Sequence, residues 1–297
     1  MSTLQNKIDF AVILRVKNAN PNGDPLNGNR PRTDYSNFGE MTDVSIKRKI
    51  RDRLVERYVT LVKDGQPTDG QAIFVQSDDR KIDDARNLRE RAEKALGNKL
   101  GSDETYALAC KTWLDVRAFG QLFALKSNKK SGKKKEDGSD AEGDTGVSIG
   151  IRGPVTVQSA FSVEPIDISS VQITKSVSGE GDGTKRGSDT MGMKHRVDQG
   201  VYVFYGSMNP QLAGRTDFSD ADAESIKKVL PKLFENDESS ARPAGSMEVM
   251  KVIWWKHSCK SGQYSSAKVH RTLTVKPDGS YDLASLPELV PEEINGF

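Results

Sequence analysis

Two arginines and an asparagine stand in a segment that cannot form regular structure. Residues 20–32 contain three prolines and two glycines, which interrupt both helices and strand ladders. A polar loop remains, with exposed backbone amides, the Asn22 side chain and the Arg30 and Arg32 guanidinium groups. Such donors suit an extended, negatively charged ligand better than a packed core.

A second set of cations lies at the start of an expected helix. A helix that begins near Thr42 or Asp43 carries Lys47, Arg48 and Arg51 on its first turns. Free backbone amides and cations meet phosphate together at such a helix start. Loop and helix therefore predict a grip on a nucleic-acid backbone, through contacts that are electrostatic and independent of base sequence. The alternative is a solvated turn followed by the polar face of an ordinary helix.

Further cations occur at the expected edges of strands. They are Arg152 and the run Lys194, His195 and Arg196. Taken alone, each is better interpreted as a surface charge. Beside the first cluster, they would extend a basic track.

A metal-dependent nuclease is the alternative from another functional class. Two-metal chemistry requires converging carboxylates, and the candidates are Asp24, Asp34, Asp43 and Asp115. Asp is also common in turns and at helix caps, which are the expected places of Asp24 and Asp43. The three histidines lack zinc-binding spacing, and no P-loop, dinucleotide-binding glycine pattern or serine-hydrolase elbow is present. We therefore expect no metal and no cofactor.

The distribution of charge along the chain is more informative than the net charge. The chain has 297 residues, 35% of them hydrophobic, and a formal net charge of only +2. Residues 41–58 hold six Lys or Arg against three acids, and residues 242–271 hold six against one. Residues 217–238 hold seven acids against three bases. Basic and acidic faces of this kind favour directional contacts, including contacts between copies of the chain.

Cysteine content and hydropathy predict a protein of a reducing cytoplasm. The two cysteines, Cys110 and Cys259, lie far apart and form no CxxC pair, so a disulfide is not expected. No signal peptide and no run of 18 apolar residues is found, so we expect no membrane partner.

Apolar periodicity predicts an α+β fold. Ile46, Ile50 and Leu54 indicate the buried stripe of the first helix, beside a ridge of Lys49, Arg53 and Arg57, while Tyr202 and Phe204 share one strand face and are expected in the core. Strands are expected at 8–16, 71–76, 147–163, 200–206 and 247–255, with an extended segment at 267–275. Further helices are expected at about 79–96, 103–113 and 218–235. Helices on one face of a mainly antiparallel sheet fit a ferredoxin-like βαββαβ core with long insertions, although a mixed α/β sheet is also possible.

Two segments do not fit this pattern. Residues 126–146 are a low-complexity run of lysines followed by acids, which predicts a mobile insertion in a single domain of residues 1–297. Residues 175–190 are polar and rich in glycine, which predicts a projecting loop.

The motifs together resemble a known family. The segments 20–32, 42–51, 115–120, 152–160 and 194–206 occur in the order found in the repeated backbone subunit of the type I-C CRISPR surveillance complex (Cascade), within the RAMP superfamily. No single segment is specific, but the combination spans nearly the whole chain.

The resemblance implies a modified RNA-recognition-like palm with finger, web and thumb insertions, in which 175–194 matches the thumb. It implies a non-catalytic subunit whose copies stack head to tail along CRISPR RNA and present the guide to target DNA. The implied further partners are the guide-processing, large and small subunits of the type I-C complex. The family's phosphate-gripping positions map onto Ser45, Lys47, Arg48 and Arg51. A nuclease of the same superfamily stays the alternative.

Overall fold

The protein is built around one large antiparallel sheet, seen in a computed structural model that describes residues 2–125, 147–175 and 191–297. The central path of the sheet runs β14-β11-β1-β10-β8-β4, and β7 and β9 also pair with β10. In chain order the elements are β1 (Ile8–Ala19), β2 (Gly23–Asp24), η1 (Pro25–Asn27), β3 (Arg30–Pro31), β4 (Phe38–Met41), α1 (Asp43–Lys63), α2 (Leu88–Leu96), η2 (Gly97–Lys99), α3 (Thr105–Thr112), α4 (Leu114–Phe119), β5 (Gln121–Leu125), β6 (Val147–Ile151), β7 (Val155–Val157), β8 (Ala160–Pro165), β9 (Ile168–Thr174), β10 (Met191–Met208), α5 (Pro210–Thr216), α6 (Asp220–Val229), η4 (Leu230–Lys232), β11 (Met247–Lys256), α7 (Ser266–His270), β12 (Leu273–Val275), β13 (Tyr281–Leu283) and β14 (Glu292–Asn295).

β1 lies at the centre of the sheet and is apolar on both faces. It pairs with β10 on one side and with β11 on the other, both antiparallel. Phe10 packs inward on Trp254, with ring centroids 5.5 Å apart. Gly206 lies opposite Phe10, and a Cβ there would come within 2.2 Å of the Phe10 ring. The pairing of these two central strands therefore requires a glycine at 206.

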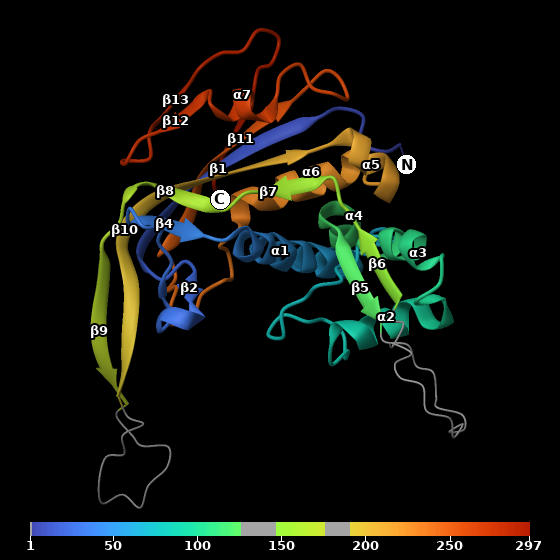
Figure 1. Cartoon of the computed structure of the whole chain (residues 1–297), viewed down its shortest axis with the longest axis horizontal. Coiled ribbons are helices and arrows are strands. Elements are labelled where there is room, and N and C mark those ends of the chain that lie inside the picture. The colour runs from blue at the N-terminus through green and yellow to red at the C-terminus, as the bar shows by residue number, and fades with distance from the viewer. Residues whose placement is uncertain (1, 126–146, 176–190) are drawn as a thin grey trace, which may run out of the picture.

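The inner face of the sheet is covered by α1 and α6, which lie on the same side in Figure 1. Ile46, Ile50 and Leu54 are at most 1% exposed and join Tyr202 and Phe204 in one core cluster. Their burial confirms both the expected helix stripe and the expected core position of the two rings. On the ridge beside this stripe, Lys49 and Arg53 are also buried.

The outer face is covered by the C-terminal segment, including α7, β12 and β13. Ile13, Val201 and Trp255 form a second apolar cluster there with Val269 and Leu273. The covering segment is also fixed by polar contacts at its start.

Asp9 anchors this covering segment from within the sheet. Its carboxylate is fully buried, 2.9 Å from His257 Nε2 and 3.2 Å from Lys7 Nζ. Burial alone would raise the pKa of Asp9, but His257, Ser266, Lys7 and His270 together hold it below its usual value. The other carboxylate oxygen lies 3.7 Å from Nε2 of His270, and neither of these two atoms has a hydrogen-bond partner.

A third cluster packs α2, α3 and α4 against the β5–β6 hairpin. Phe74 contacts Trp113 and Phe123, with centroid distances of 4.6 and 5.2 Å. The expected strand at 71–76 is wrong, since only an isolated bridge joins Ala72 to Trp113. The amides of Phe74 and Val75 instead donate to the buried Asp115 carboxylate, at 2.7 and 3.1 Å. The Asp115 carboxylate thus accepts the hydrogen bonds that the carbonyls of a neighbouring strand would otherwise accept.

Other helix and strand boundaries differ from the expected ones because helix-capping side chains fix where the helices begin. The helix expected at 79–96 covers only Leu88–Leu96, because Asn87 accepts the Glu90 amide and starts the helix there. The extended segment expected at 267–275 begins as α7, capped by Ser265, and only its end is strand. The regions 103–113 and 218–235 hold helix, but α4 follows α3 as a separate element and α6 is preceded by α5.

The strands expected at 8–16, 147–163, 200–206 and 247–255 are present, the third as part of the much longer β10. The predicted mobile insertion 126–146 lies outside the described residues. The same holds for 176–190 of the expected thumb, whereas residues 191–194 belong to β10. None of the helices in the described ranges is long and apolar enough to cross a membrane.

The role assigned to Asp115 predicts a large stability loss in Asp115→Ala. The change leaves two buried amides and the Arg51 guanidinium without their acceptor, so we expect the free energy of unfolding to fall by about 3–5 kcal/mol. Urea unfolding measures the change. Asp43→Ala is the control, because it removes an exposed carboxylate paired with Lys47 and should cost about 1 kcal/mol or less. Equal losses in the two variants would contradict the structural role of Asp115.

The partly buried His270 predicts weaker stability in mild acid. Burial lowers the pKa of His270 below its ordinary value of 6.5, although Asp9 and a backbone hydrogen bond oppose the shift. The unfolded chain therefore binds this proton more readily, and stability is complete above pH 6.5 and declines as the pH falls below it. Unfolding midpoints measured from pH 7.5 down to 5 should fall less in His270→Gln. A variant that follows the unmodified protein throughout would show that His270 does not contribute.

Candidate nucleic-acid interface

The loop at 20–32 is an ordered element with its own hydrogen bonds. The buried Asn20 donates from its side-chain Nδ2 to the carbonyl of Asn29 at 2.7 Å. Its backbone amide donates to the carbonyl of Ala241 at 2.8 Å. Asp24 caps η1 by accepting the Leu26 amide at 3.2 Å. These contacts fix the short β2–β3 hairpin that carries Arg30 and Arg32.

Asn22 joins this loop to the start of α1. Its Oδ1 accepts from the amide and the hydroxyl of Thr42, at 2.9 and 3.0 Å. Thr42 is the N-cap of α1 and accepts the Ser45 amide at 3.3 Å. The structure therefore uses the Asn22 carbonyl to position the helix start.

Arg30 joins the same loop to the β9–β10 hairpin. Its Nη1 donates to Ser170 Oγ at 3.1 Å, and that hydroxyl lies 2.8 Å from Nδ1 of His195. Ser170 and His195 are directly opposite each other in the strand pairing. Sequence reasoning missed Ser170, because no local signal gives the register between two strands.

Lys194 and Arg196 flank His195 on β10. Alternation along a strand points them to the face opposite His195. Arg196 Nε lies 4.0 Å from Asp198, and both side chains remain more than two-fifths exposed. One face of the hairpin thus carries Lys194 and Arg196, and the other carries the His195 imidazole beside Ser170.

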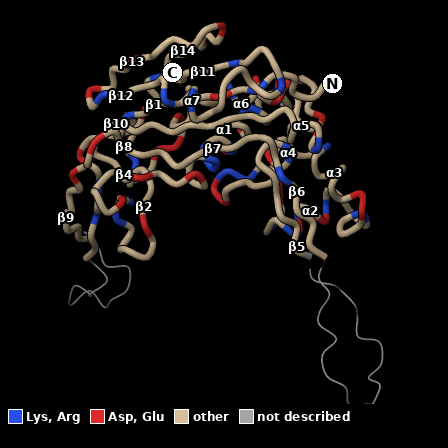
Figure 2. Tube along the Cα trace, turned by 45° about the horizontal axis from the view of Figure 1, so that its top comes forward, with Lys and Arg blue, Asp and Glu red and all other residues tan. Residues whose placement is uncertain are grey.

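The cations at the start of α1 are held to different degrees. Lys47 contacts Asp43 at 2.8 Å, and Arg48 contacts Asp79 at 3.3 Å with 57% of its side chain exposed. Figure 2 shows basic and acidic positions intermixed around this helix. Exposed pairs of this type contribute about 0–1 kcal/mol, so a phosphate can replace the carboxylate at little cost.

Arg51 is held far more firmly. Its Nε lies 3.0 Å from Asp115, its side chain is only 14% exposed, and its guanidinium stacks over Phe119 at 5.0 Å. Separating a buried pair costs several kcal/mol. Arg51 is therefore placed to support the surface more than to exchange partners.

Arg32 and Arg152 complete the predicted set. Arg32 lies 3.4 Å from Asp24, and its buried Nε has no hydrogen-bond partner. Arg152 is exposed between β6 and β7, and no hydrogen bond or ion pair within the described ranges joins it to the loop or to the hairpin. The structure thus brings together the loop, α1 and the hairpin, and leaves Arg152 apart.

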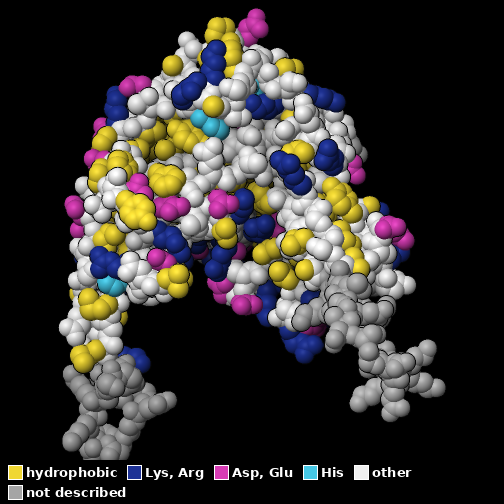
Figure 3. All heavy atoms as spheres, in the orientation of Figure 1, with side chains coloured by type: hydrophobic (Ala, Val, Ile, Leu, Met, Phe, Trp, Pro, Cys, Tyr) yellow, Lys and Arg dark blue, Asp and Glu magenta, His cyan; other side chains and the backbone are white. Residues whose placement is uncertain are grey.

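The shape of the molecule gives these elements a common setting. Figure 3 shows a hollow between two arms, with Lys and Arg side chains along its upper margin. The β9–β10 hairpin forms one arm and the β5–β6 hairpin lies in the other, with α1 between them (Figure 1). An extended strand of charged polymer fits such an arch.

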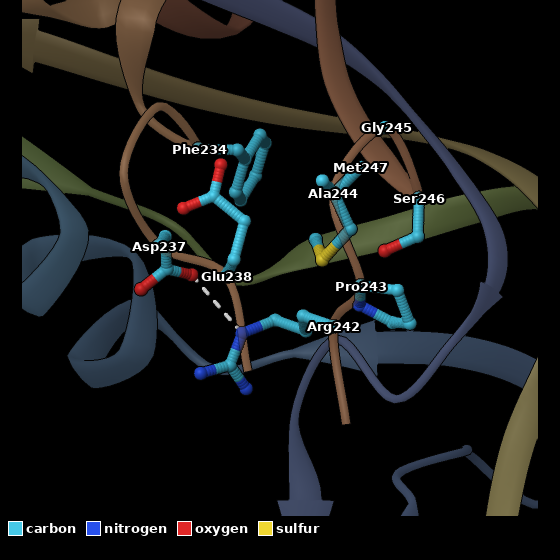
Figure 4. A pocket seen from close by; sticks show the side chains of 9 residues that line it. All are labelled: Phe234, Asp237, Glu238, Arg242, Pro243, Ala244, Gly245, Ser246 and Met247. Atoms are coloured by element: carbon cyan, nitrogen blue, oxygen red, sulfur yellow. Dashed lines mark hydrogen bonds and ion pairs between the residues drawn. The ribbon is translucent and has the colours of Figure 1, made fainter. Parts of the chain in front are cut away.

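A buried ionic group holds the inner side of α1. Lys49 pairs with Asp237, which also accepts from Arg242 Nε at 3.0 Å (Figure 4). Burial lowers the pKa of Lys49, although Asp237 opposes the shift. The pocket beside this group has a volume of only about 20 Å³, which is room for one water. This group is therefore part of the scaffold and offers no ligand site.

The carboxylates of the nuclease alternative are each engaged in local structure. Asp24 caps η1, Asp34 accepts the amides of Ser36 and Phe38, Asp43 pairs with Lys47, and Asp115 is buried against Arg51. Across residues 2–125, 147–175 and 191–297, no three His, Cys, Asp or Glu side chains gather as metal ligands would. No observation on these residues favours metal-dependent chemistry.

Comparisons with known proteins give the family. The family model described as CRISPR-associated protein Cas7 matches residues 6–289. A curated relative from Haloferax volcanii, also described as CRISPR-associated protein Cas7, is 25% identical over 299 residues, covering 98% of this chain and 81% of the relative.

Solved structures with a similar chain include a CRISPR RNA-guided surveillance complex in a pre-nicking state, with a TM-score of 0.46 and 14% identity over 84% of this chain and 78% of that chain. A second CRISPR RNA-guided surveillance complex gives 0.45 and 16%, over 92% and 77%. The family predicted from the motifs is confirmed, while the I-C subtype stays a prediction. Because the family model spans nearly the whole sequence, this protein belongs to the Cas7 family of CRISPR-associated proteins.

Proposed function

We propose that this chain is a non-catalytic backbone subunit of a type I-C CRISPR surveillance complex, and that it binds the guide RNA through phosphate contacts. The observation that carries the proposal is the joining of three basic elements. Asn22 ties the loop at 20–32 to α1, and Arg30 ties the same loop to the β9–β10 hairpin. The cations of all three elements are therefore held on one continuous surface beside the hollow of Figure 3.

The proposed contacts are divided by how each side chain is held. Lys47 and Arg48 are the main proposed phosphate ligands. Lys47 pairs with the partly exposed Asp43, and Arg48 is 57% exposed and pairs with the exposed Asp79 and, at 3.8 Å, with the buried Asp52. Ser45 lies in the first turn of α1, where backbone amides add to the contact. The remaining proposed contact or positioning residues are Asn22, Arg30, Arg32, Arg51, Arg152, Lys194, His195 and Arg196.

The proposed architecture is a ferredoxin-like palm with insertions. Its support is the antiparallel order β11-β1-β10-β8, with α1 between β1 and β8 in the chain and α6 between β10 and β11. The β9–β10 hairpin is the base of the proposed thumb, and α2–α4 with β5–β6 correspond to fingers. Bound in this way, the guide's bases stay free to pair with target DNA.

The proposed partners follow from this arrangement. They are guide RNA, target DNA, further copies of the chain stacked head to tail, and the guide-processing, large and small subunits of the complex, in the prokaryotic cytoplasm. A head-to-tail contact joins two different surfaces of one chain and closes no ring.

The phosphate grip predicts a change in salt dependence in Lys47→Ala/Arg48→Ala. Each phosphate contact to a single strand contributes about −0.7 to the slope of log K against log salt, so the slope should become shallower by about 1.4. Binding of a guide-length RNA, measured by fluorescence anisotropy at several salt concentrations, gives the slope. Arg51 is left unchanged so that its pair with Asp115 keeps the fold intact.

Arg89→Ala/Lys94→Ala is the matched control. The side chains of Arg89 and Lys94 are 45% and 47% exposed and also pair with carboxylates, but they lie on α2. The control should keep the full slope. Identical slopes in both double variants, or strong dependence on base sequence, would refute the proposed grip.

The scaffold role predicts assembly that follows RNA length. One continuous strand raises the effective concentration of neighbouring copies, and contacts between copies supply the register. Mass photometry should show fewer bound copies on an RNA of half the guide length. A fixed stoichiometry on both RNAs, or divalent-metal-dependent cutting lost in Asp24→Ala, Asp34→Ala, Asp43→Ala or Asp115→Ala, would contradict this role.

A further inference from the structure

The outer face of the sheet carries an exposed ring, Phe161, and a half-buried ring, Tyr205, on adjacent strands. Phe161 on β8 pairs with Val203 on β10, so it shares a face with Val203 and with Tyr205 two residues further along. This diagonal arrangement leaves the two rings within reach of neighbouring ligand groups. Phe161 is 43% exposed, an unusual position for a phenyl ring in a sheet. Figure 3 shows hydrophobic side chains gathered over β8 and β10.

A cavity opens beside Tyr205. It is a shallow, open depression with a volume of about 480 Å³. It is lined by Gln158, Tyr205, Ala267, His270, Arg271 and Leu273. The imidazole of His270 stacks on the Tyr205 ring, with centroids 4.7 Å apart and planes inclined by 27°. The cavity therefore combines a stacked planar pair with an amide and a guanidinium group.

The chain beside this cavity is basic. Residues 256–271 contain Lys256, Lys260, Lys268 and Arg271 and no acid. Arg271 is exposed and lines the cavity itself. On the other side Glu40 lies opposite Phe161 in the pairing of β4 with β8. An anionic group is therefore favoured at the Arg271 end and disfavoured at the β4 edge.

We propose that this face is a second binding site, which takes unpaired nucleotides of a single strand. Bases pack against Phe161 and Tyr205, the Gln158 amide donates to and accepts from a base edge, and Arg271 contacts phosphate. Aromatic faces accept any base, so the site is tolerant of sequence. It lies on the sheet face opposite α1, and it therefore differs from the guide site and does not depend on it.

The chemistry of the site favours a nucleic acid over a protein partner. A protein interface of this size would need a broad apolar surface, whereas here the exposed ring is followed by a cavity with a stacked pair and a cation. Planar rings with an adjacent guanidinium are the elements by which proteins hold unstacked bases.

The test uses the full chain already loaded with guide RNA, so that the guide site is occupied. The probe is a fluorescein-labelled oligothymidylate that cannot pair with the guide, and anisotropy gives its affinity. Phe161→Ala/Arg271→Ala should weaken binding about fivefold or more. Phe161→Trp should keep or strengthen it, because a larger ring still stacks. A single-stranded RNA of the same length separates a DNA ligand from an RNA ligand, and a duplex should bind poorly because its bases are paired.

Val62→Ala/Arg89→Ala is the control, since it removes an exposed apolar side chain and an exposed cation at positions outside the proposed site. It should leave the probe's affinity unchanged. Guide content is measured in every variant, so loss of the guide site is seen separately. Unchanged probe affinity in Phe161→Ala/Arg271→Ala, equal binding of the duplex, or a shift of oligomeric state without loss of probe binding would overturn the proposal.

Discussion

β1 is apolar on both faces, and this single constraint places the rest of the molecule. A strand of this kind needs two apolar covers, since each large side chain left in water forfeits about 1.5–3 kcal/mol. α1 and α6 supply the inner cover, and the segment that includes α7 supplies the outer one. The position of α1 follows from its stripe of Ile46, Ile50 and Leu54. Lys47 and Arg48, near the start of this helix, are thereby fixed next to the loop that directly follows β1.

Carboxylates decide which cations on this surface can exchange partners. Lys47 pairs with the partly exposed Asp43, and Arg48 pairs at 3.3 Å with the exposed Asp79 and more distantly with the buried Asp52, so both are held more weakly than Arg51. Arg51 faces the buried Asp115, and the same residue organises the chain around Phe74. A phosphate can therefore displace the first kind of pair without disturbing the fold. The second kind links the proposed interface to the core beneath α2–α4.

The sequence predicted what local patterns determine. The apolar run of β1 and the four-residue repeat of α1 needed no tertiary information, and Thr42 marked the helix start. The strand expected at 71–76 failed because Asp115, about forty residues later, takes the amides of Phe74 and Val75. The bridge from Arg30 through Ser170 to His195 depends on a strand register that no local signal reveals. The burial of Lys49 depends on Asp237, which is distant in sequence, so no local pattern reveals it.

We propose that one continuous surface, formed by the loop at 20–32, the start of α1 and the β9–β10 hairpin, grips the guide. Hydrogen–deuterium exchange of the chain with and without guide RNA is the sharpest test, because amides held by a bound strand exchange more slowly. We expect added protection in all three elements together, centred on residues 22–32, 42–48 and 168–174. Protection confined to other parts of the chain, or to one of the three elements alone, would contradict it.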